Sequence, residues 1–162
     1  MPVKQSTTFV FWGYRCDEVA AVTYVSGLRR LGLRVQLVGI AVHGLEGVYG
    51  VTLQPDLLLN DALLQVKKAI CIVLPCDDAA LRRFLSDGRL PGFFQTAWLR
   101  GARFVTQDET EELLQSLLPV VEEAGVAREI ITYSVGDDLV AAVNHLAIQL
   151  LAKVTRHAKK QT

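Results

Sequence analysis

The chain has 162 residues, 51% of them hydrophobic, and its 17 basic side chains balance its 17 acidic ones. This length suits one domain that can bury a core without disulfides or metal ions. The apolar content excludes a disordered chain, and the balanced charge provides no field that would attract nucleic-acid phosphates. Three cysteines at low density indicate a reducing, cytoplasmic environment, and no apolar run is long enough to cross a bilayer. We therefore expect neither a membrane nor a nucleic-acid partner.

The first forty residues alternate between strand and helix patterns. Residues 7–12 are rich in β-branched and aromatic side chains and stop at a glycine, which is typical of a strand followed by a turn. Residues 17–31 predict a helix, with Asp17 as its N-cap and Gly32 just after its last turn. Residues 34–39 predict a second strand. The three segments therefore form a βαβ unit with parallel strands.

The next segment is rich in glycine. Residues 41–55 contain three glycines and predict a β-hairpin or small excursion, with its strands near 48–54. Residues 57–66 predict a short apolar helix. Residues 69–74 form an uninterrupted apolar run stopped by Pro75, which is typical of a central parallel strand covered on both faces.

The rest of the chain continues the alternation. Helices are expected at 77–87, 91–99, 108–124 and 137–156, and strands at 103–106 and 129–133. The two ends, residues 1–6 and 157–162, are expected to fray. These elements predict one α/β domain over residues 1–162, a flavodoxin-like three-layer sandwich with a mostly parallel five-stranded sheet and a small β-hairpin excursion.

Three segments together resemble a known family. The first is the βαβ unit, whose helix ends in Leu-Arg-Arg-Leu-Gly at 28–32. The second is Gly-Val-Thr-Leu-Gln-Pro-Asp-Leu-Leu-Leu-Asn-Asp-Ala at 50–62, and the third is Ile-Val-Leu-Pro at 72–75. Their order and spacing, from residue 8 to about residue 151, resemble the ThiJ/PfpI family of the class I glutamine amidotransferase-like superfamily.

The resemblance implies a cysteine nucleophile on a strained strand-to-helix elbow, a glutamate that holds its thiolate, and a histidine in a later loop. In this chain Gln107 stands at the nucleophile's position, Ala20 aligns with the glutamate, and Glu18 lies two residues too early. Only residues 124–128 stand where the family has the long segment that carries its histidine. The family's Pro-Gly-Gly turn is replaced by Pro-Cys-Asp at 75–77. Four parts of the active site are missing, which predicts a degenerate, non-catalytic member, a pseudoenzyme.

The cysteines leave an alternative open. Cys76 follows the predicted central strand and precedes a helix N-terminus, which would lower the pKa of its thiol. It is the candidate nucleophile of the alternative function, a cysteine-dependent hydrolase or glyoxalase-type enzyme; the competing interpretation is that a tight turn needs a small residue there. Cys16 follows the first strand at the matching end, again before a helix, and could lie beside Cys76 as a redox pair or soft-metal site, without the CxxC spacing of such sites. Cys71 is assigned to the core.

The remaining polar residues favour structural roles. The acidic pairs at 77–78 and 137–138 stand at helix starts, where Asp caps free N–H groups. The histidines at 43, 145 and 157 form no constellation, and no G-x-G-x-x-G pattern follows a strand. We therefore expect no metal and no cofactor.

If a ligand binds, we expect it at the carboxyl edge of the sheet, where the loops at 14–18, 75–78 and 106–108 converge. The candidate ligand-binding residues are Cys16, Glu18, Cys76, Asp77 and Gln107. Free helix N–H groups would favour a small anion or carboxylate there. Alternatively, nearby carboxylates fill the helix ends themselves and close the crevice: Asp17, Glu18, Asp77, Asp78 and Asp108.

The expected function is a binding or regulatory module, homo-oligomeric and expected to be a homodimer, that takes a small anionic ligand or a protein partner. Two aromatic regions are candidate dimer surfaces. One is the segment 90–99, which carries three aromatic residues within 93–98 and could instead pack onto the sheet. The other comprises Trp12, Tyr14 and Tyr24.

Overall fold

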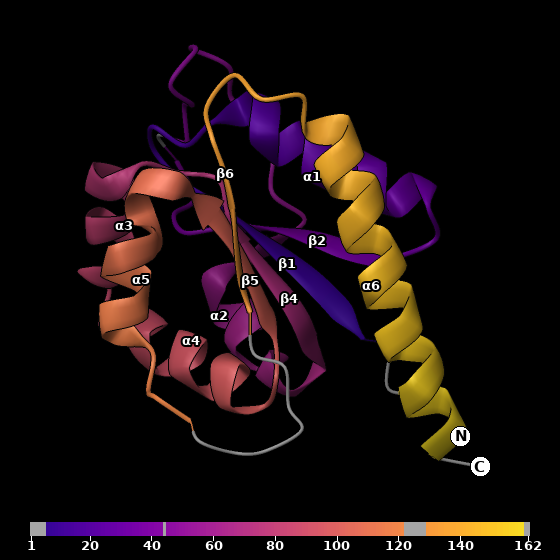
Figure 1. The fold of residues 1–162 in the computed structure, drawn as a ribbon. Coiled ribbons are helices and arrows are strands. Elements are labelled where there is room, and N and C mark those ends of the chain that lie inside the picture. Colours follow the sequence, from indigo (N-terminus) through magenta and orange to yellow (C-terminus); the bar gives the residue numbers. More distant parts are fainter. Residues whose placement is uncertain (1–5, 44, 122–128, 161–162) are drawn as a thin grey trace.

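A parallel sheet forms the centre of the molecule in the computed structural model, which describes residues 6–43, 45–121 and 129–160. Within these residues the sheet has six strands in the order β3-β2-β1-β4-β5-β6, and each strand runs parallel to its neighbours (Figure 1). The strands are β1 Thr7–Trp12, β2 Arg34–Gly39, β3 Leu57–Leu58, β4 Ala69–Leu74, β5 Arg103–Gln107 and β6 Ile130–Tyr133. The flavodoxin-like α/β class predicted from the sequence is confirmed, with six strands in place of five.

Helices cover both faces of the sheet. They are α1 Glu18–Arg30, α2 Leu59–Leu63, α3 Asp78–Leu85, α4 Leu90–Leu99, α5 Glu111–Leu117 and α6 Leu139–Lys160, with 3₁₀ turns η1 Val66–Lys68 and η2 Asp108–Thr110. Figure 1 shows α1 and α6 side by side on one side of the sheet and α3, α4 and α5 on the other. In the described residues, no helix has the length and apolar character needed to span a membrane.

The core forms where the central strand meets α4. β1 is buried along its whole length because it lies between β2 and β4: Val10 is paired with Leu37 on one side and Val73 on the other. Phe94 of α4 packs edge-on against Phe11 and Phe104, with ring centroids 5.3 and 5.9 Å apart.

This packing decides between the interpretations of the aromatic residues. Phe93 and Phe94 are buried against the sheet, so this part of the segment 90–99 belongs to the core. Trp12 and Tyr24 are also buried, which removes them from any dimer surface, whereas Tyr14 is 52% exposed.

Local signals set both ends of α1 and the start of α3, as expected. Asp17 accepts a hydrogen bond from Ala20 N at 3.0 Å, and Asp77 accepts one from Ala80 N at 2.8 Å. Gly32 follows α1 with φ of +90°, a conformation that favours glycine.

The additional strand, β3, lies where we expected a helix to begin. Leu57 and Leu58 pair with the end of β2 because Asp56 forms two hydrogen bonds of 2.8 Å with the backbone of Leu37. In one, Asp56 N donates to Leu37 O, and in the other the Asp56 carboxylate accepts from Leu37 N. The predicted helix at 57–66 is therefore wrong in its first turn, and α2 ends at Leu63.

The predicted hairpin near 48–54 is a tight turn with one antiparallel bridge, between Glu46 and Thr52. Gly47 N donates to Val51 O at 2.9 Å, and Gly50 sits at φ of +84°. Gly47 and Gly50 weaken extended pairing in this stretch, so the segment folds as a compact turn. We call residues 45–52 the edge turn.

The last two helices end at residues other than those predicted. The helix expected at 108–124 ends at Leu117, because Pro119 holds Leu118 in an extended conformation; positions 122–124 lie outside the described residues. The last helix continues through Lys160, so residues 157–160 are helical rather than frayed. The expected fraying of residues 1–5 and 161–162 also lies outside the described residues.

Candidate functional site

The strand order reverses at β1 and β4, so the loops after these neighbouring strands diverge and leave a crevice at the carboxyl edge of the sheet. A cavity of about 150 Å³ lies at this edge. Its walls come from the loops after β1, β4, β5 and β6 and from the edge turn, through Arg15, Asp17, Val48, Tyr49, Asp77, Gln107, Glu109 and Val135. The cavity lies at the edge where we expect a ligand to bind if one does.

Gln107 occupies the end of β5, where the family resemblance places a nucleophile. Its side chain lines the cavity, but the residue is only 5% exposed. The backbone is relaxed, with φ of −66° and ψ of 150°, so the strained elbow that the resemblance implies is absent at this residue. Beside it in the register lies Tyr133, and burial raises the pKa of the Tyr133 hydroxyl well above its ordinary value.

The turn after β5 is built by threonines. Thr110 Oγ1 donates to Gln107 O at 2.9 Å, and the Thr106 and Thr110 hydroxyls are hydrogen-bonded to each other. Asp108, which we expected to cap the following helix, instead accepts a hydrogen bond from Ser134 Oγ after β6. That bond lowers the pKa of the Asp108 carboxyl. Asp108 therefore joins two strand ends.

Cys16 and Cys76 lie in contact with each other, each next in sequence to a residue that lines the cavity, but neither cysteine lines it. Both are fully buried, and their thiols are hydrogen-bonded to each other. That bond, followed by burial, raises the pKa of Cys76 well above its ordinary value. The pKa of Cys76 is therefore shifted in the direction opposite to the lowering expected from a helix N-terminus. Cys71 is a core residue, as predicted, and burial raises the pKa of its thiol to about 12.

Glu18 supports the cavity wall and is absent from the lining. It is 5% exposed; its Oε1 accepts from Tyr49 N at 2.5 Å, and its Oε2 has no hydrogen-bond partner among the described residues. A Cβ on Gly47 would lie 1.5 Å from that Oε2, so the edge turn packs directly on the carboxylate. Trp12 Nε1 adds a hydrogen bond to Leu45 O at 3.0 Å. The buried acid thus anchors the edge turn.

The five carboxylates that could have closed the crevice divide into different roles. Asp17 and Asp77 cap helices, whereas Asp78 forms an exposed ion pair with Arg82 at 3.0 Å. Glu18 and Asp108 bond to the edge turn and to Ser134. Self-capping is therefore partial, and the cavity remains. Among the described residues, no three His, Cys, Asp or Glu side chains are placed to hold a metal ion.

Sequence reasoning placed Asp17, Asp77 and Gln107 at the edge, but it missed half of the cavity wall. Arg15, with φ of 66°, was included only as part of a loop, and Tyr49 was assigned to a hairpin without a site role. Glycine spacing at 44, 47 and 50 was the available signal for the edge turn. Its position over β1 depends on contacts more than thirty residues apart in sequence, such as Val48 N to Cys16 O at 2.8 Å.

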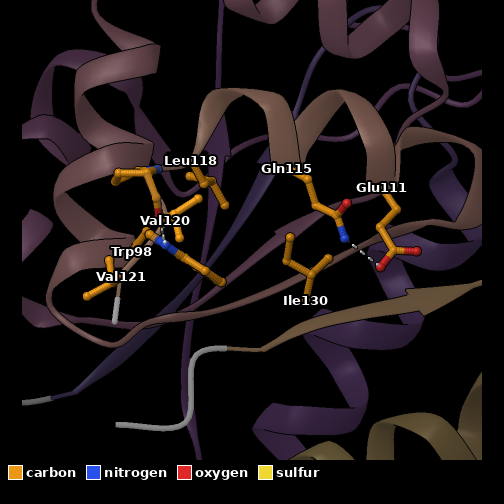
Figure 2. Close-up of a pocket in the computed structure, with 8 residues that line it drawn as sticks. Trp98, Glu111, Gln115, Leu118, Val120, Val121 and Ile130 are labelled. Carbon is orange, nitrogen blue, oxygen red and sulfur yellow. Dashed lines mark hydrogen bonds between the residues drawn. The ribbon is translucent and has the colours of Figure 1, made fainter. Parts of the chain in front are cut away.

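A larger cavity of about 510 Å³ lies between α4, α5 and β6 (Figure 2). Trp98 Nε1 donates to Pro119 O at 2.9 Å beside it, and Gln115 bonds to Glu111 on its other side. Its lining reaches Val121, where this described stretch of the chain ends. We place no site there.

Comparison with known proteins places the chain by its fold. No protein-family model matches the sequence, and no curated protein matches it. Among solved structures, it is similar to Drosophila melanogaster DJ-1beta, with a TM-score of 0.67, 16% identity and coverage of 97% of each chain. It is also similar to oxidized Toxoplasma gondii DJ-1, with a TM-score of 0.65, 18% identity and coverage of 96% of this chain and 95% of that one.

Longer proteins contain the same fold as one part. The chain matches a two-domain Anabaena variabilis protein with dj-1/thij/pfpi-like and ferritin-like domains, with a TM-score of 0.66 and 16% identity. The match covers 89% of this chain and 49% of that one. The chain likewise spans 56% of the VC2308 protein, with a TM-score of 0.58. This protein therefore has the DJ-1/ThiJ/PfpI fold, which confirms at the level of fold the resemblance found in its sequence.

Proposed function

We propose that this protein is a non-catalytic, cytoplasmic binding or regulatory module that takes a small ligand in the cavity at the carboxyl edge of the sheet. The observation that carries the proposal is the replacement of the nucleophile by Gln107 on a relaxed backbone. An amide cannot act as the thiolate that this position supplies in the family the sequence resembles. It can, however, donate and accept hydrogen bonds to a ligand in the cavity that it lines.

The lining charges define the ligand's chemistry. Asp17, Asp77 and Glu109 contribute three acidic side chains, and Arg15 contributes one basic side chain. The caps of α1 and α3 already occupy helix N–H groups that an anion would need. These charges favour a ligand with a cationic or hydrogen-bond-donating group, and with one carboxylate for Arg15, over the simple anion expected from the helix dipoles.

The size of the cavity limits the ligand to a small molecule. Its volume of about 150 Å³ is below the ~300–1,000 Å³ typical of sites for drug-sized ligands. A small amino acid or a short amine fits both the volume and the charge. Tyr49, which is 59% exposed at the rim, offers an aromatic face to such a group.

The test measures binding of small amino acids, monoamines and monocarboxylates to the whole chain by calorimetry and thermal shift. We expect amino acids or amines to bind and to raise the melting temperature, with affinity reduced in Tyr49→Ala. Tyr14→Ala is the matched control, because Tyr14 is 52% exposed and absent from the cavity lining. Binding of monocarboxylates alone, equal loss in both variants, or no binding by any class would contradict the proposal.

The alternative enzyme function requires an accessible thiolate at Cys76. Its complete burial, its hydrogen bond to Cys16 and its raised pKa all disfavour that role. The direct test is turnover of methylglyoxal and of peptide substrates. We expect none; turnover that is abolished in Cys76→Ser would establish the enzyme and overturn the non-catalytic proposal.

The proposal includes self-association through the face formed by α1 and α6. Val19, Val22, Val140 and Ile148 are between 45% and 69% exposed on these adjacent helices. A groove of about 290 Å³ is lined by residues of both helices, among them Val22 and Val140. Light scattering on the purified chain is expected to give twice the monomer mass, and Ile148→Glu is expected to reduce it to the monomer. A monomeric native chain would remove homodimerisation from the proposal.

A further inference from the structure

The backbone holds Cys16 and Cys76 next to each other at two fixed points. Asp17 N donates to Pro75 O at 2.7 Å, so the peptide unit that follows Cys16 is bonded to the peptide unit that precedes Cys76. The two thiols are hydrogen-bonded to each other. Both residues stand at strand ends, after β1 and β4, and both are fully buried.

We propose that Cys16 and Cys76 form a reversible disulfide that joins the loop after β1 to the loop after β4 beneath the cavity. A disulfide needs Cα atoms about 4.4–6.8 Å apart and side chains directed toward each other. The two thiols are directed toward each other, because they are hydrogen-bonded. The backbone hydrogen bond between the adjacent peptide units favours the required separation of the Cα atoms. The third cysteine, Cys71, lies inside β4 and serves as an internal control.

A peroxide is the oxidant class that fits this site, because it is small and needs no docking surface. In the first step, the sulfur of one cysteine bonds to a peroxide oxygen, the O–O bond breaks, and the departing hydroxide takes the thiol proton as water. In the second step, the other sulfur attacks the sulfenic sulfur, the S–O bond breaks, and the hydroxyl leaves with the second thiol proton as water. Two thiols lose two electrons, and hydrogen peroxide becomes two water molecules.

Oxidation of Cys16 and Cys76 would affect the cavity through the residues that follow the two cysteines in sequence. Asp17 and Asp77 directly follow the two cysteines, cap α1 and α3, and line the cavity. A covalent bond between residues 16 and 76 fixes the separation of these two carboxylates. The redox state of the pair would therefore set the width of the cavity, whichever ligand occupies it.

The experiment treats the whole purified chain with hydrogen peroxide, blocks the remaining thiols under denaturing conditions and maps the peptides by mass spectrometry. We expect a Cys16–Cys76 link that is two hydrogens lighter than the separate peptides, a blocked Cys71, and reversal by dithiothreitol. We expect slow formation, since both sulfurs are buried. A link to Cys71, sulfenic or sulfinic acid without a link, or both thiols free after treatment would overturn the proposal.

Variants and a thermal measurement separate the link from general oxidation. Cys71→Ala is expected to keep the disulfide, and Cys16→Ser is expected to lose it and leave Cys76 unlinked. The oxidised wild-type chain is expected to melt several degrees above the reduced chain, because the bond closes a loop of about 60 residues. This readout needs no variant to fold. A confirmed link that leaves the melting temperature unchanged or lowers it would contradict the inference that the two side chains are already placed for a disulfide.

Discussion

Two regions of this molecule are held together by different physics. The aromatic layer between α4 and the sheet consists of apolar side chains in edge-on contact, such as Phe94 against Phe11 and Phe104. The carboxyl edge consists of backbone and carboxylate hydrogen bonds around a cavity, with Asp17, Asp77 and Glu18 each accepting from a backbone N–H. Burial is non-directional and tolerates no loss of volume, whereas the edge depends on single directional bonds. The difference predicts where a substitution costs stability and where it changes the shape of a site.

The largest expected effect is in the aromatic layer. Phe94→Ala removes a fully buried ring that contacts Phe11, Phe93 and Phe104. The lost burial and the cavity left behind should lower the free energy of unfolding by about 3–5 kcal/mol. Urea titration with an unchanged m-value measures it. A loss below about 1 kcal/mol would show that the layer repacks freely, and the contrast between the two regions would then fail.

At the edge, Gly47→Ala should cost about 1–3 kcal/mol through overpacking. The new Cβ would meet Glu18 Oε2 at 1.5 Å and Trp12 Cη2 at 2.8 Å. Adding Glu18→Ala should recover part of this loss, since the closest clashing atoms are then gone. A double-mutant cycle on urea midpoints gives the coupling. Strict additivity of the two changes would contradict direct packing of the edge turn on Glu18.

Loss of a single cap should cost less. Asp17→Ala leaves Ala20 N without its side-chain acceptor, and the free energy of unfolding should fall by about 1 kcal/mol. Asp17→Asn should retain most of the stability, because the amide oxygen can accept the same bond. The comparison uses thermal melts of both variants. Equal destabilisation by Asn and Ala would show that charge, and not the cap hydrogen bond, is what Asp17 contributes.

The smallest effect on stability is expected just before α4, where Asp87 and Arg89 form an ion pair at 2.6 Å. The hydrogen bonds from Arg89 lower the pKa of Asp87 from 3.8 to about 2. A carboxyl whose pKa is lower in the folded state stabilises above its unfolded pKa, and this contribution disappears as the pH falls toward 2. Because the pair is largely exposed, Asp87→Asn should cost under ~1 kcal/mol at pH 7. Urea midpoints at pH 7 and pH 2 should show that most of the difference is lost at the lower pH.

The core of the fold could be predicted because its signals are local. The apolar run at 69–74, the caps at Asp17 and Asp77, and Gly32 fix strands and helix ends through their immediate neighbours. The additional strand, β3, could not be predicted in this way. A strand of two residues has no periodicity to detect, and Leu57–Leu58 form a strand only because Asp56 is hydrogen-bonded to the backbone of Leu37.

For the candidate site, the sequence determined which residues stand at the strand ends, because parallel strands joined by helices must place those ends at one edge. It therefore placed Cys16, Cys76, Asp77 and Gln107 at that edge; Asp77 and Gln107 line the cavity in the structure, whereas Cys16 and Cys76 are buried and absent from its lining. Only the tertiary structure decided the long-range contacts there: two thiols face each other, Asp108 bonds to Ser134, and the edge turn closes over Glu18. These outcomes depend on contacts between residues tens of positions apart, and their geometry is set by packing that no local pattern encodes.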